Sequence, residues 1–341
     1  MANRDILAIG TSAGGVEALL FLAARLERHF PAAVLLTIHL PSHIKSSLDQ
    51  LLTRAGPLPA TFAKDGDVLK KSQIYIAPPD RHLLVDGARL FLGEGSRENN
   101  ARPAIDPMLR SAAVCCGSRS IGVVLTGTLG DGASGLWAIR KAGGIAVVQD
   151  PEDAAFSEMP LNAVNRAQPD HIVTLAEMPA LLASLVKQPA GAAKPLPRSL
   201  RYEAEIARTG QSSMKEMDTI GRRSLLACPD CGGVTWEIDE DDLSRFRCHT
   251  GHTYNAELMT LALDDNLRRA LTSAVRALEE RAALARKLLD QAKASGHRLL
   301  AETWAAKARE FERETEIIRD STRRMDRFSA QAEISKQSAA E

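Results

Sequence analysis

A serine flanked by glycines lies near the start of the chain, in the stretch ILAIGTSAGGVEAL that begins at Ile6. Ser12 fits the spacing G-x-S-x-G, in which a sharp turn between a strand and a helix exposes the serine hydroxyl above a sheet edge. The two common phosphate-binding patterns, G-x-G-x-x-G and G-x-x-x-x-G-K-[ST], are both absent here. Nucleotide binding is therefore the least favoured of three interpretations, beside a catalytic serine and a plain tight turn.

A serine nucleophile needs a base and a group that orients the base. His39 ends an apolar run in TIHLP, and Asp131 follows another such run in VVLTGTLGDGASGL. Functional groups of doubly wound sheets gather at the carboxyl ends of the strands, so we expect Ser12, His39 and Asp131 on one rim. Each alone also fits a structural role, as a core, turn or helix-capping residue. Together they favour a triad, in a chain order that differs from that of the α/β-hydrolases.

Three of the five cysteines cluster late in the chain with metal-binding spacing. CPDCGG places Cys228 and Cys231 on either side of two residues, and Cys248 follows at a zinc-ribbon distance. The fourth ligand is His249 or His252. Adjacent side chains point apart, so we choose His252 and predict a closed, structural Cys₃His zinc site, with no metal needed for catalysis. The alternatives are unrelated thiols or a redox pair, and the odd cysteine count favours a reducing cytoplasm over disulfides.

The elements that must position these residues alternate along residues 1–186. Short apolar runs alternate with amphipathic stretches, which predicts a doubly wound α/β domain with a mostly parallel sheet covered on both faces. Two further runs, Leu83–Val85 and Leu90–Leu92, flank Asp86-Gly87 and predict a hairpin. The expected strands are Ile6–Ile9, Ala33–Ile38, Ile74–Ile76, Ile121–Leu125, Ile145–Val148 and His171–Leu175, and the expected helices are Val16–Arg28, Ser46–Ala55, Pro107–Cys116 and Gly135–Ala142.

The rest of the chain divides into segments of different composition. KQPAGAAKPLPRS has no hydrophobic period and is typical of a linker. Apolar residues then recur at steps of three or four on both sides of a break at Ser295-Gly296, which predicts a helical hairpin or coiled coil. We expect a catalytic domain at 1–186, a linker at 187–199, a connecting segment at 200–224, a zinc-ribbon-like module at 225–256, the helical hairpin at 257–330 and a disordered tail at 331–341.

Composition excludes several classes of function. The 341 residues include 43 Lys and Arg and 43 Asp and Glu, so bulk electrostatic binding of nucleic acid is not indicated. Apolar residues make up 45% of the chain, the share of an ordinary globular protein. No signal peptide and no apolar stretch long enough to span a membrane is found, so we expect a cytoplasmic protein without membrane insertion.

Seven sequence blocks occur in the order found in a known family. The chain resembles the catalytic domain of the protein-glutamate methylesterases, the chemotaxis CheB family, over about residues 4–186. The blocks are IGTSAGG, HLP, IYIAPPDRHLLV, RPAIDPMLRSAA, GVVLTGTLGDGASGL, AGGIAVVQDP and SEMPLNAV.

The resemblance implies a reaction and roles for residues. It implies hydrolysis of glutamate γ-methyl esters on chemoreceptor helices with release of methanol, and deamidation of receptor glutamines is a related activity. Ser12 is then the nucleophile, His39 the base and Asp131 its orienter, with His82 near the site. The amide of Ala13 is the natural oxyanion donor.

The chain departs from the family pattern in three places. A second oxyanion donor is expected from the loop of Gly127, Thr128 and Leu129, but the family pattern has Met-Gly where this chain has Thr128-Leu129. Ser12 lies so early that we expect no receiver domain before it, hence a stand-alone catalytic domain. The zinc-ribbon-like module and the helices are a C-terminal extension.

Two alternative functions remain open. The triad is also compatible with an esterase that acts on another protein or a small ester. A weakly active scaffold is the third reading, with the C-terminal helices docking helical signalling partners. The presence of Ser12, His39 and Asp131 together argues against the scaffold.

Overall fold

The N-terminal part of the chain is built around a seven-stranded parallel sheet. The computed structural model describes residues 3–39, 46–192, 194–240 and 243–338. The strand order is β3-β4-β2-β1-β7-β8-β9, and every neighbouring pair is parallel. The strands are β1 (Ile6–Thr11), β2 (Ala33–Ile38), β3 (Ala60–Phe62), β4 (Ile74–Ile76), β7 (Ser120–Val124), β8 (Ile145–Gln149) and β9 (His171–Val173). The predicted doubly wound sheet is thus confirmed.

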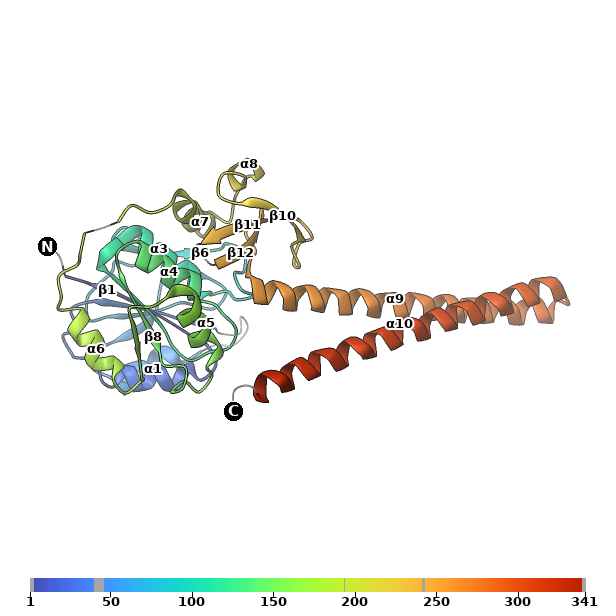
Figure 1. The fold of residues 1–341 in the computed structure, drawn as a ribbon, viewed down its shortest axis with the longest axis horizontal. Helices are drawn as coiled ribbons and strands as arrows, with labels where there is room; N and C mark the ends of the chain where they lie inside the picture. The colour runs from blue at the N-terminus through green and yellow to red at the C-terminus, as the bar shows by residue number, and fades with distance from the viewer. Residues whose placement is uncertain (1–2, 40–45, 193, 241–242, 339–341) are drawn as a thin grey trace. The chain divides into compact units, whose positions relative to one another are not determined.

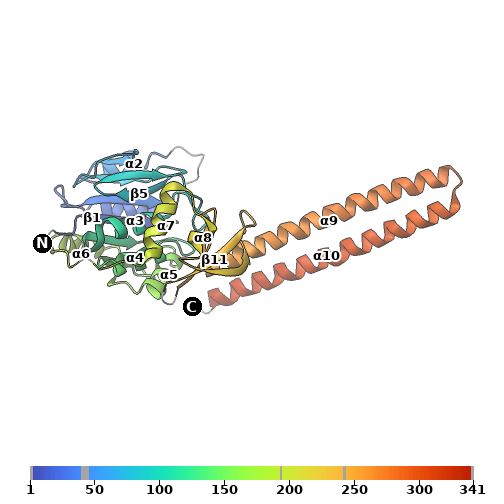
Figure 2. The same ribbon diagram turned by 90° about the horizontal axis from the view of Figure 1, so that it is seen from above.

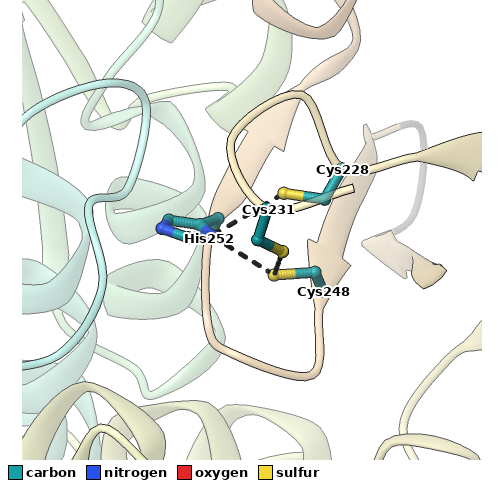
Figure 3. A group of neighbouring side chains, drawn as sticks. All are labelled: Cys228, Cys231, Cys248 and His252. Carbon is teal, nitrogen blue, oxygen red and sulfur yellow. Dashed lines mark hydrogen bonds between the residues drawn. The ribbon is translucent and has the colours of Figure 1, made fainter. Parts of the chain in front are cut away.

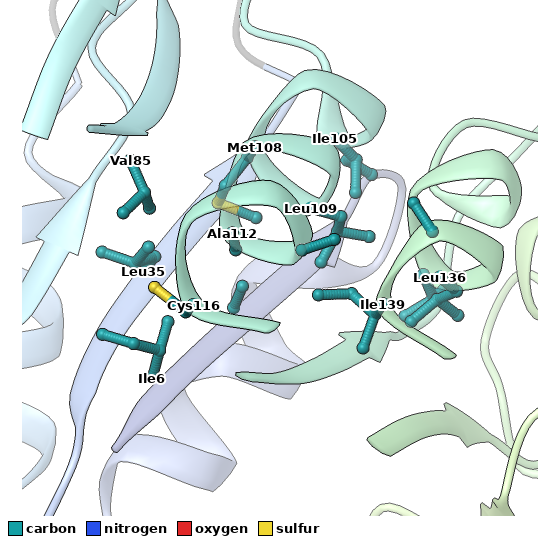
Figure 4. Close-up of a cluster of buried hydrophobic side chains, with 14 of the residues drawn as sticks. Ile6, Leu35, Val85, Ile105, Met108, Leu109, Ala112, Cys116, Leu136 and Ile139 are labelled. Atoms are coloured by element: carbon teal, nitrogen blue, oxygen red, sulfur yellow. The ribbon is translucent and has the colours of Figure 1, made fainter. Parts of the chain in front are cut away.

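Helices cover both faces of this sheet (Figure 1). Successive residues of β1 face opposite sides: Ile6 and Ala8 join one buried cluster, whereas Leu7 and Ile9 join the other. Figure 4 shows the first cluster, where Leu109 of the central helix lies on the side of Ile139 and Leu136. The helices are α3 (Ile105–Cys116), α4 (Ala133–Lys141) and α5 (Glu158–Ala167) with residues in this cluster, and α1 (Gly15–Ala23), α2 (Leu48–Ala55) and α6 (Met178–Leu185) with residues in the other.

The predicted hairpin is present beside the main sheet. Strands β5 (His82–Asp86) and β6 (Arg89–Gly93) pair antiparallel across the expected Asp86-Gly87 turn. Gly87 has a φ of 61°, the left-handed conformation that such a turn requires. Strand β3 was not predicted, because three residues are too short to show a hydrophobic period.

A second, smaller sheet follows in the C-terminal half. Helix α7 (Arg198–Thr209) and the short helix α8 (Met214–Met217) precede it. Its antiparallel order is β10-β11-β12-β13, with β10 (Arg222–Ala227), β11 (Val234–Glu240), β12 (Leu243–Cys248) and β13 (Thr253–Asn255). We call residues 222–255 the Cys₃His module. It occupies nearly the range expected for a zinc-ribbon-like unit.

The structure divides the chain at a different place from the expected linker. Residues 1–259 form one compact unit and residues 260–341 a second. The segment at 187–199 lies against the first unit, since Pro189 bridges to Asn3 and the Lys194 amide donates to the Ala142 carbonyl. Leu200, just after it, is fully buried in the core cluster that contains α3. The Pro- and Ala-rich composition therefore marks an irregular segment rather than a boundary between independent units.

The second unit is a pair of long helices. Helices α9 (Ala256–Ala294) and α10 (Arg298–Ser338) run side by side in opposite directions (Figure 2), joined by a turn in which Gly296 has a φ of 74°. Ion pairs from Arg286 to Glu312 and from Arg319 to Glu279 link them. Helix α10 passes the expected end at 330, because good helix formers and no Gly or Pro follow. Residues 339–341 of the expected tail lie outside the described residues.

None of the described helices is long and apolar enough to cross a bilayer.

Candidate active site and metal site

Ser12 lies on a tight turn between β1 and α1. Its amide donates to the Thr126 carbonyl at 3.1 Å, which ties the turn to the loop after β7. Gly14 has a φ of 72°, and a Cβ there would lie 3.1 Å from Thr126 Oγ1. The left-handed conformation therefore favours glycine, and a side chain there would press on its neighbours. The turn holds the Ser12 hydroxyl at the carboxyl end of β1 and beside the N-terminus of α1.

The structure brings Ser12, His39 and Asp131 together. Ser12 Oγ lies 3.1 Å from His39 Nδ1, and His39 Nε2 lies 2.8 Å from Asp131 Oδ2. His39 follows β2 and Asp131 follows β7, the two neighbours of β1 in the sheet. The chain passes from β1 to β2 on one side, whereas β7 lies on the other side of β1. The strand order thus reverses at β1, and the three residues meet at this topological switch point. Such a point is where open α/β sheets bind ligands.

The proton on His39 is placed by its partners. Asp131 is ionised, so its carboxylate accepts and His39 Nε2–H donates. Nδ1 then carries the lone pair, and the Ser12 hydroxyl donates to it. The side chain of His39 is 24% exposed, whereas that of Asp131 is 1% exposed. The arrangement can accept a proton from the serine while the buried carboxylate stabilises the resulting imidazolium.

Asp131 stays charged in a buried position because donors surround it. Burial alone would raise its pKa, but the hydrogen bond from His39 and the donors around it hold the pKa below its ordinary value. Oδ2 also accepts from the Ile105 amide at 2.7 Å, in the first turn of α3. Oδ1 accepts from the side chain of Asn99 and from the amides of Asp106 and Gly132.

Asn99 and Asp106 were not predicted from the sequence. Asn99 Nδ2 donates both to Asp131 Oδ1 at 3.0 Å and to Asp106 Oδ2 at 2.9 Å. Burial, followed by the negative charge of Asp131, raises the pKa of Asp106 to about 8. Two neighbouring buried carboxyl groups therefore differ in charge: Asp131 is ionised and Asp106 is protonated at neutral pH.

The N-terminal half of the chain is similar to known proteins. The family model described as CheB methylesterase matches residues 7–182. This chain belongs to the CheB methylesterase family. A Leptospira interrogans protein named for protein-glutamate methylesterase and protein-glutamine glutaminase activity is 32% identical over 184 residues, which cover 54% of this chain and 95% of that protein.

A second relative and a solved structure of the same family are similar to this part of the chain. A Myxococcus xanthus protein named protein-glutamate methylesterase/protein-glutamine glutaminase 3 is 38% identical over 181 residues, which cover 53% of this chain and 51% of that protein. The crystal structure of the Thermotoga maritima CheB methylesterase catalytic domain aligns with a TM-score of 0.52 at 31% identity, covering 55% of this chain and all of that chain. The Cys₃His module and the long helices lie outside the family match.

The loop after β7 differs from the common CheB methylesterase pattern at Leu129. Leu129 has a φ of 68°, a conformation that the glycine of that pattern adopts without cost. Its amide donates to Glu158 Oε2 and its carbonyl accepts from Asn162 Nδ2, both at 2.9 Å, and these bonds hold the unusual backbone. The Gly127 amide is also engaged, with the Phe156 carbonyl.

Two amides, that of Ala13 next to Ser12 and that of Thr128 in the loop after β7, keep their N–H groups available. Within the described part of the chain, the N–H groups of Ala13 and Thr128 have no intramolecular acceptor. Gly127, the residue before Thr128, leaves no room for a side chain, since a Cβ there would lie 2.9 Å from Ser12 Cβ. In the loop of the expected second donor, Thr128 keeps its N–H group available, whereas the amides of Gly127 and Leu129 are already bonded.

His82, expected near the site, bonds the segment that leads to Ile105. It is fully buried at the start of β5, where Nε2 donates to the Ser96 carbonyl at 3.0 Å and Nδ1 accepts from the Ala104 amide at 3.3 Å. Burial lowers its pKa, so the ring is neutral. His82 supports the segment before Ile105, whose amide reaches Asp131.

The four predicted metal ligands converge in the Cys₃His module (Figure 3). The ligand atoms of Cys228, Cys231, Cys248 and His252 all lie within 4.8 Å of one another. Cys231 Sγ is 3.7 Å from Cys248 Sγ, and His252 Nδ1 is 3.5 Å from Cys248 Sγ. Ligands of a tetrahedral zinc ion bound at about 2.3 Å are separated by roughly 3.8 Å, so the spacing fits.

Two residues around the cluster carry groups that would support a bound metal ion. The Asp230 carboxylate lies 3.8 Å from His252 Nε2, where a carboxylate orients a metal-binding imidazole. The hydroxyl of Thr250 lies 2.9 Å from Cys248 Sγ and can donate to a thiolate. His249, the alternative ligand, is not among the four converging residues; its ring packs against Gly233.

Proposed function

We propose that the chain is a serine hydrolase that removes methyl groups from glutamate γ-methyl esters of methyl-accepting chemoreceptors. The observation that carries this proposal is the chain of hydrogen bonds from Ser12 through His39 to Asp131, at the switch point of a CheB methylesterase domain. The names of the relatives support the substrate, and they also support deamidation of receptor glutamines as a second activity.

The geometry supports a two-step acyl transfer. His39 Nδ1 takes the proton of Ser12 as its oxygen attacks the ester carbonyl, and the amides of Ala13 and Thr128 donate to the oxyanion. The tetrahedral intermediate collapses, and His39 returns the proton to the departing methoxide, which leaves as methanol. Water then attacks the acyl-serine with His39 as base, and glutamate and free Ser12 result. For glutamine the leaving group is ammonia.

The first experiment compares Ser12→Ala with Ser321→Ala in the release of methanol from methylated receptor fragments. Ser321 is an exposed serine of α10, so its change serves as a matched control. Removal of a triad nucleophile lowers kcat by about a millionfold, and we expect undetectable turnover with unchanged circular dichroism. Residual methanol release above a small fraction of wild type contradicts the nucleophile assignment. Ser12-dependent cleavage of a small ester without methanol release identifies an esterase of another substrate.

We also propose that the Cys₃His module holds one structural zinc ion. The support is the donor set itself, three sulfurs and an imidazole nitrogen at tetrahedral spacing. Four protein ligands leave no open position for water, so the ion stabilises the module and takes no part in ester cleavage. Elemental analysis is expected to give about one zinc per chain. Cys231→Ser loses it and His249→Ala keeps it, and the reverse pattern overturns the ligand assignment.

Two further points stay predictions from the sequence. A cytoplasmic location fits the free thiols that the proposed zinc site needs. Docking of a helical partner on the C-terminal helices, and their description as a coiled coil, rest on the hydrophobic period of α9 and α10.

A further inference from the structure

A cluster of buried charges joins the catalytic sheet to the Cys₃His module. Glu98, in the loop after β6, is held by Arg110 of α3 at 2.6 Å and by Arg247 of β12 at 3.1 Å. Three positive and three negative side chains share the cluster, and all of them are buried. Separation of the two parts would leave uncompensated charges, so they are held together. The six residues are Glu98, Arg110, Glu203, Glu240, Arg245 and Arg247.

Asn99, the residue after Glu98, links the Cys₃His module to the active site. The Asn99 amide donates to the Thr253 carbonyl of β13 at 2.8 Å, and Asn99 Oδ1 accepts from the Asn255 amide at 3.3 Å. Its backbone and its side-chain oxygen are therefore both held by the module. The other end of the same side chain, Nδ2, donates to Asp131. One buried amide thus spans from β13 to the carboxylate that orients His39.

Strand β13 also lies close to the metal ligands. It begins at the residue after His252, whose carbonyl accepts from the Cys248 amide at 3.0 Å. The side chain of Asn255 abuts the loop that carries Asp131, since a Cβ on Gly130 would lie 2.5 Å from Asn255 Nδ2. The module therefore touches the surroundings of Asp131 at two points, Asn99 and Gly130.

We propose that the Cys₃His module positions the catalytic carboxylate, with β13 acting through Asn99. Thr253 and Asn255 are positioning residues, because they touch neither Ser12 nor His39. The role rests on the proposed ester hydrolysis and adds to it a requirement for the C-terminal module. Loss of the module releases Asn99, and Asp131 then loses one of its donors and its fixed orientation toward His39. The chemical step slows, while groups that contact the ester near Ser12 stay in place.

A double-mutant cycle in the full chain tests this connection. The two single changes are Asn99→Ala and Cys231→Ser, assayed on p-nitrophenyl acetate as a function of pH. A hydrogen bond to a charged group accounts for about ten- to hundredfold, and we expect each change to lower kcat by that factor with KM little altered. Because both act on the same contact, the double variant is expected to be no slower than the slower single variant. The acidic limb of the kcat/KM profile moves in the same direction in all three.

Matched variants separate positioning from folding. Cys231→His keeps a fourth ligand at an exposed position and is expected to restore wild-type kcat, and Cys115→Ser changes a thiol outside the cluster and serves as the control. If Cys231→Ser denatures the whole chain by circular dichroism, Asn255→Pro replaces it in the cycle, because it removes the backbone N–H that donates to Asn99 Oδ1. Effects that multiply in the double variant, or a lowered melting temperature with an unchanged pH profile, overturn the proposal.

The two proposals fail in different ways. Wild-type protein without Ser12-dependent turnover contradicts the proposed function. The downfield proton resonance of His39 Nε2–H then decides the positioning role, because it reports the hydrogen bond to Asp131 without turnover. We expect the resonance to shift in Asn99→Ala and in Cys231→Ser and to stay in place in Cys115→Ser. An unshifted resonance in Cys231→Ser overturns the role of the module.

Discussion

The change Asp131→Asn tests how the carboxylate sets the proton on His39. Oδ1 of Asp131 accepts three N–H groups, whereas Oδ2 accepts two, from His39 Nε2 and from the Ile105 amide. An asparagine has one carbonyl oxygen, and that oxygen replaces Oδ1 because three donors converge there. The NH₂ group then replaces Oδ2 and faces the imidazole. It can only donate, so Nε2 must become the acceptor.

The size of the effect follows from this tautomer. With Nε2 as acceptor, the proton moves to Nδ1, which faces Ser12 and can no longer take the proton of the serine. The corresponding change in serine proteases lowers kcat by about ten-thousandfold, or roughly 5.5 kcal/mol of activation free energy. The Ile105 amide also loses its acceptor, and a buried unpaired donor costs about 1–3 kcal/mol of folding stability. We therefore expect a folded, slightly less stable and nearly inactive protein.

The assay is hydrolysis of p-nitrophenyl acetate together with methanol release from methylated receptor fragments. Asp86→Asn is the matched control, because Asp86 is exposed in the β5–β6 turn and Asn-Gly supports that turn as well as Asp-Gly. Retention of more than about one tenth of wild-type kcat in Asp131→Asn would show that His39 is oriented by other groups. Loss of activity through unfolding is recognised by a missing melting transition.

Two other predictions concern stability. A chain ended after Lys187 lacks Leu200, and the loss of this side chain from the core costs about 2–5 kcal/mol of folding stability. We therefore expect a lower melting temperature and a lower kcat/KM than for a chain ended after Met259. Equal values for the two chains would show that the Cys₃His module is independent of the catalytic part. Burial and the charge of Asp131 raise the pKa of Asp106 to about 8. Between about pH 4 and pH 8 the folded chain therefore retains a proton on Asp106 that the unfolded chain has released. The free energy of unfolding is then expected to fall as the pH rises through this interval. Asp106→Asn is expected to flatten the melting temperature over that interval, and an unchanged slope contradicts a protonated Asp106.

The turn at Ser12 was predictable because its signal is local. Gly10 and Gly14 bracket the serine within five residues, and the apolar run before it is a buried strand. His39 and Asp131 were accessible by one further rule, since each follows an apolar run and parallel strands end at one edge. The four converging Cys and His residues were accessible through spacing, and the choice of His252 rested on the opposite directions of adjacent side chains.

The environment of Asp131 was not predictable in the same way. Asn99 stands in a polar stretch, SRENNARP, that has the composition of an exposed loop, and its partners lie in β13, far along the chain. Asp106 precedes Pro107 at the start of a helix, where both residue types are common. No feature of the sequence therefore indicates that Asp106 lies beside Asp131. Glu98 and Arg110 belong to residue types that are normally exposed. Only long-range packing, which no spacing rule describes, buries them together.

The buried charge cluster constrains how this chain can change through descent. Removal of one partner from a buried ion pair costs about 3–5 kcal/mol, whereas joint replacement of opposite charges by apolar residues is tolerated far better. Drift at the six cluster positions is therefore expected to occur in pairs of opposite sign. A recombination event that exchanges the C-terminal half between relatives separates Glu98 and Arg110 from Glu203 and Arg247. In an alignment of relatives with the same extension, these positions should covary across the junction, although they lie far apart in the sequence.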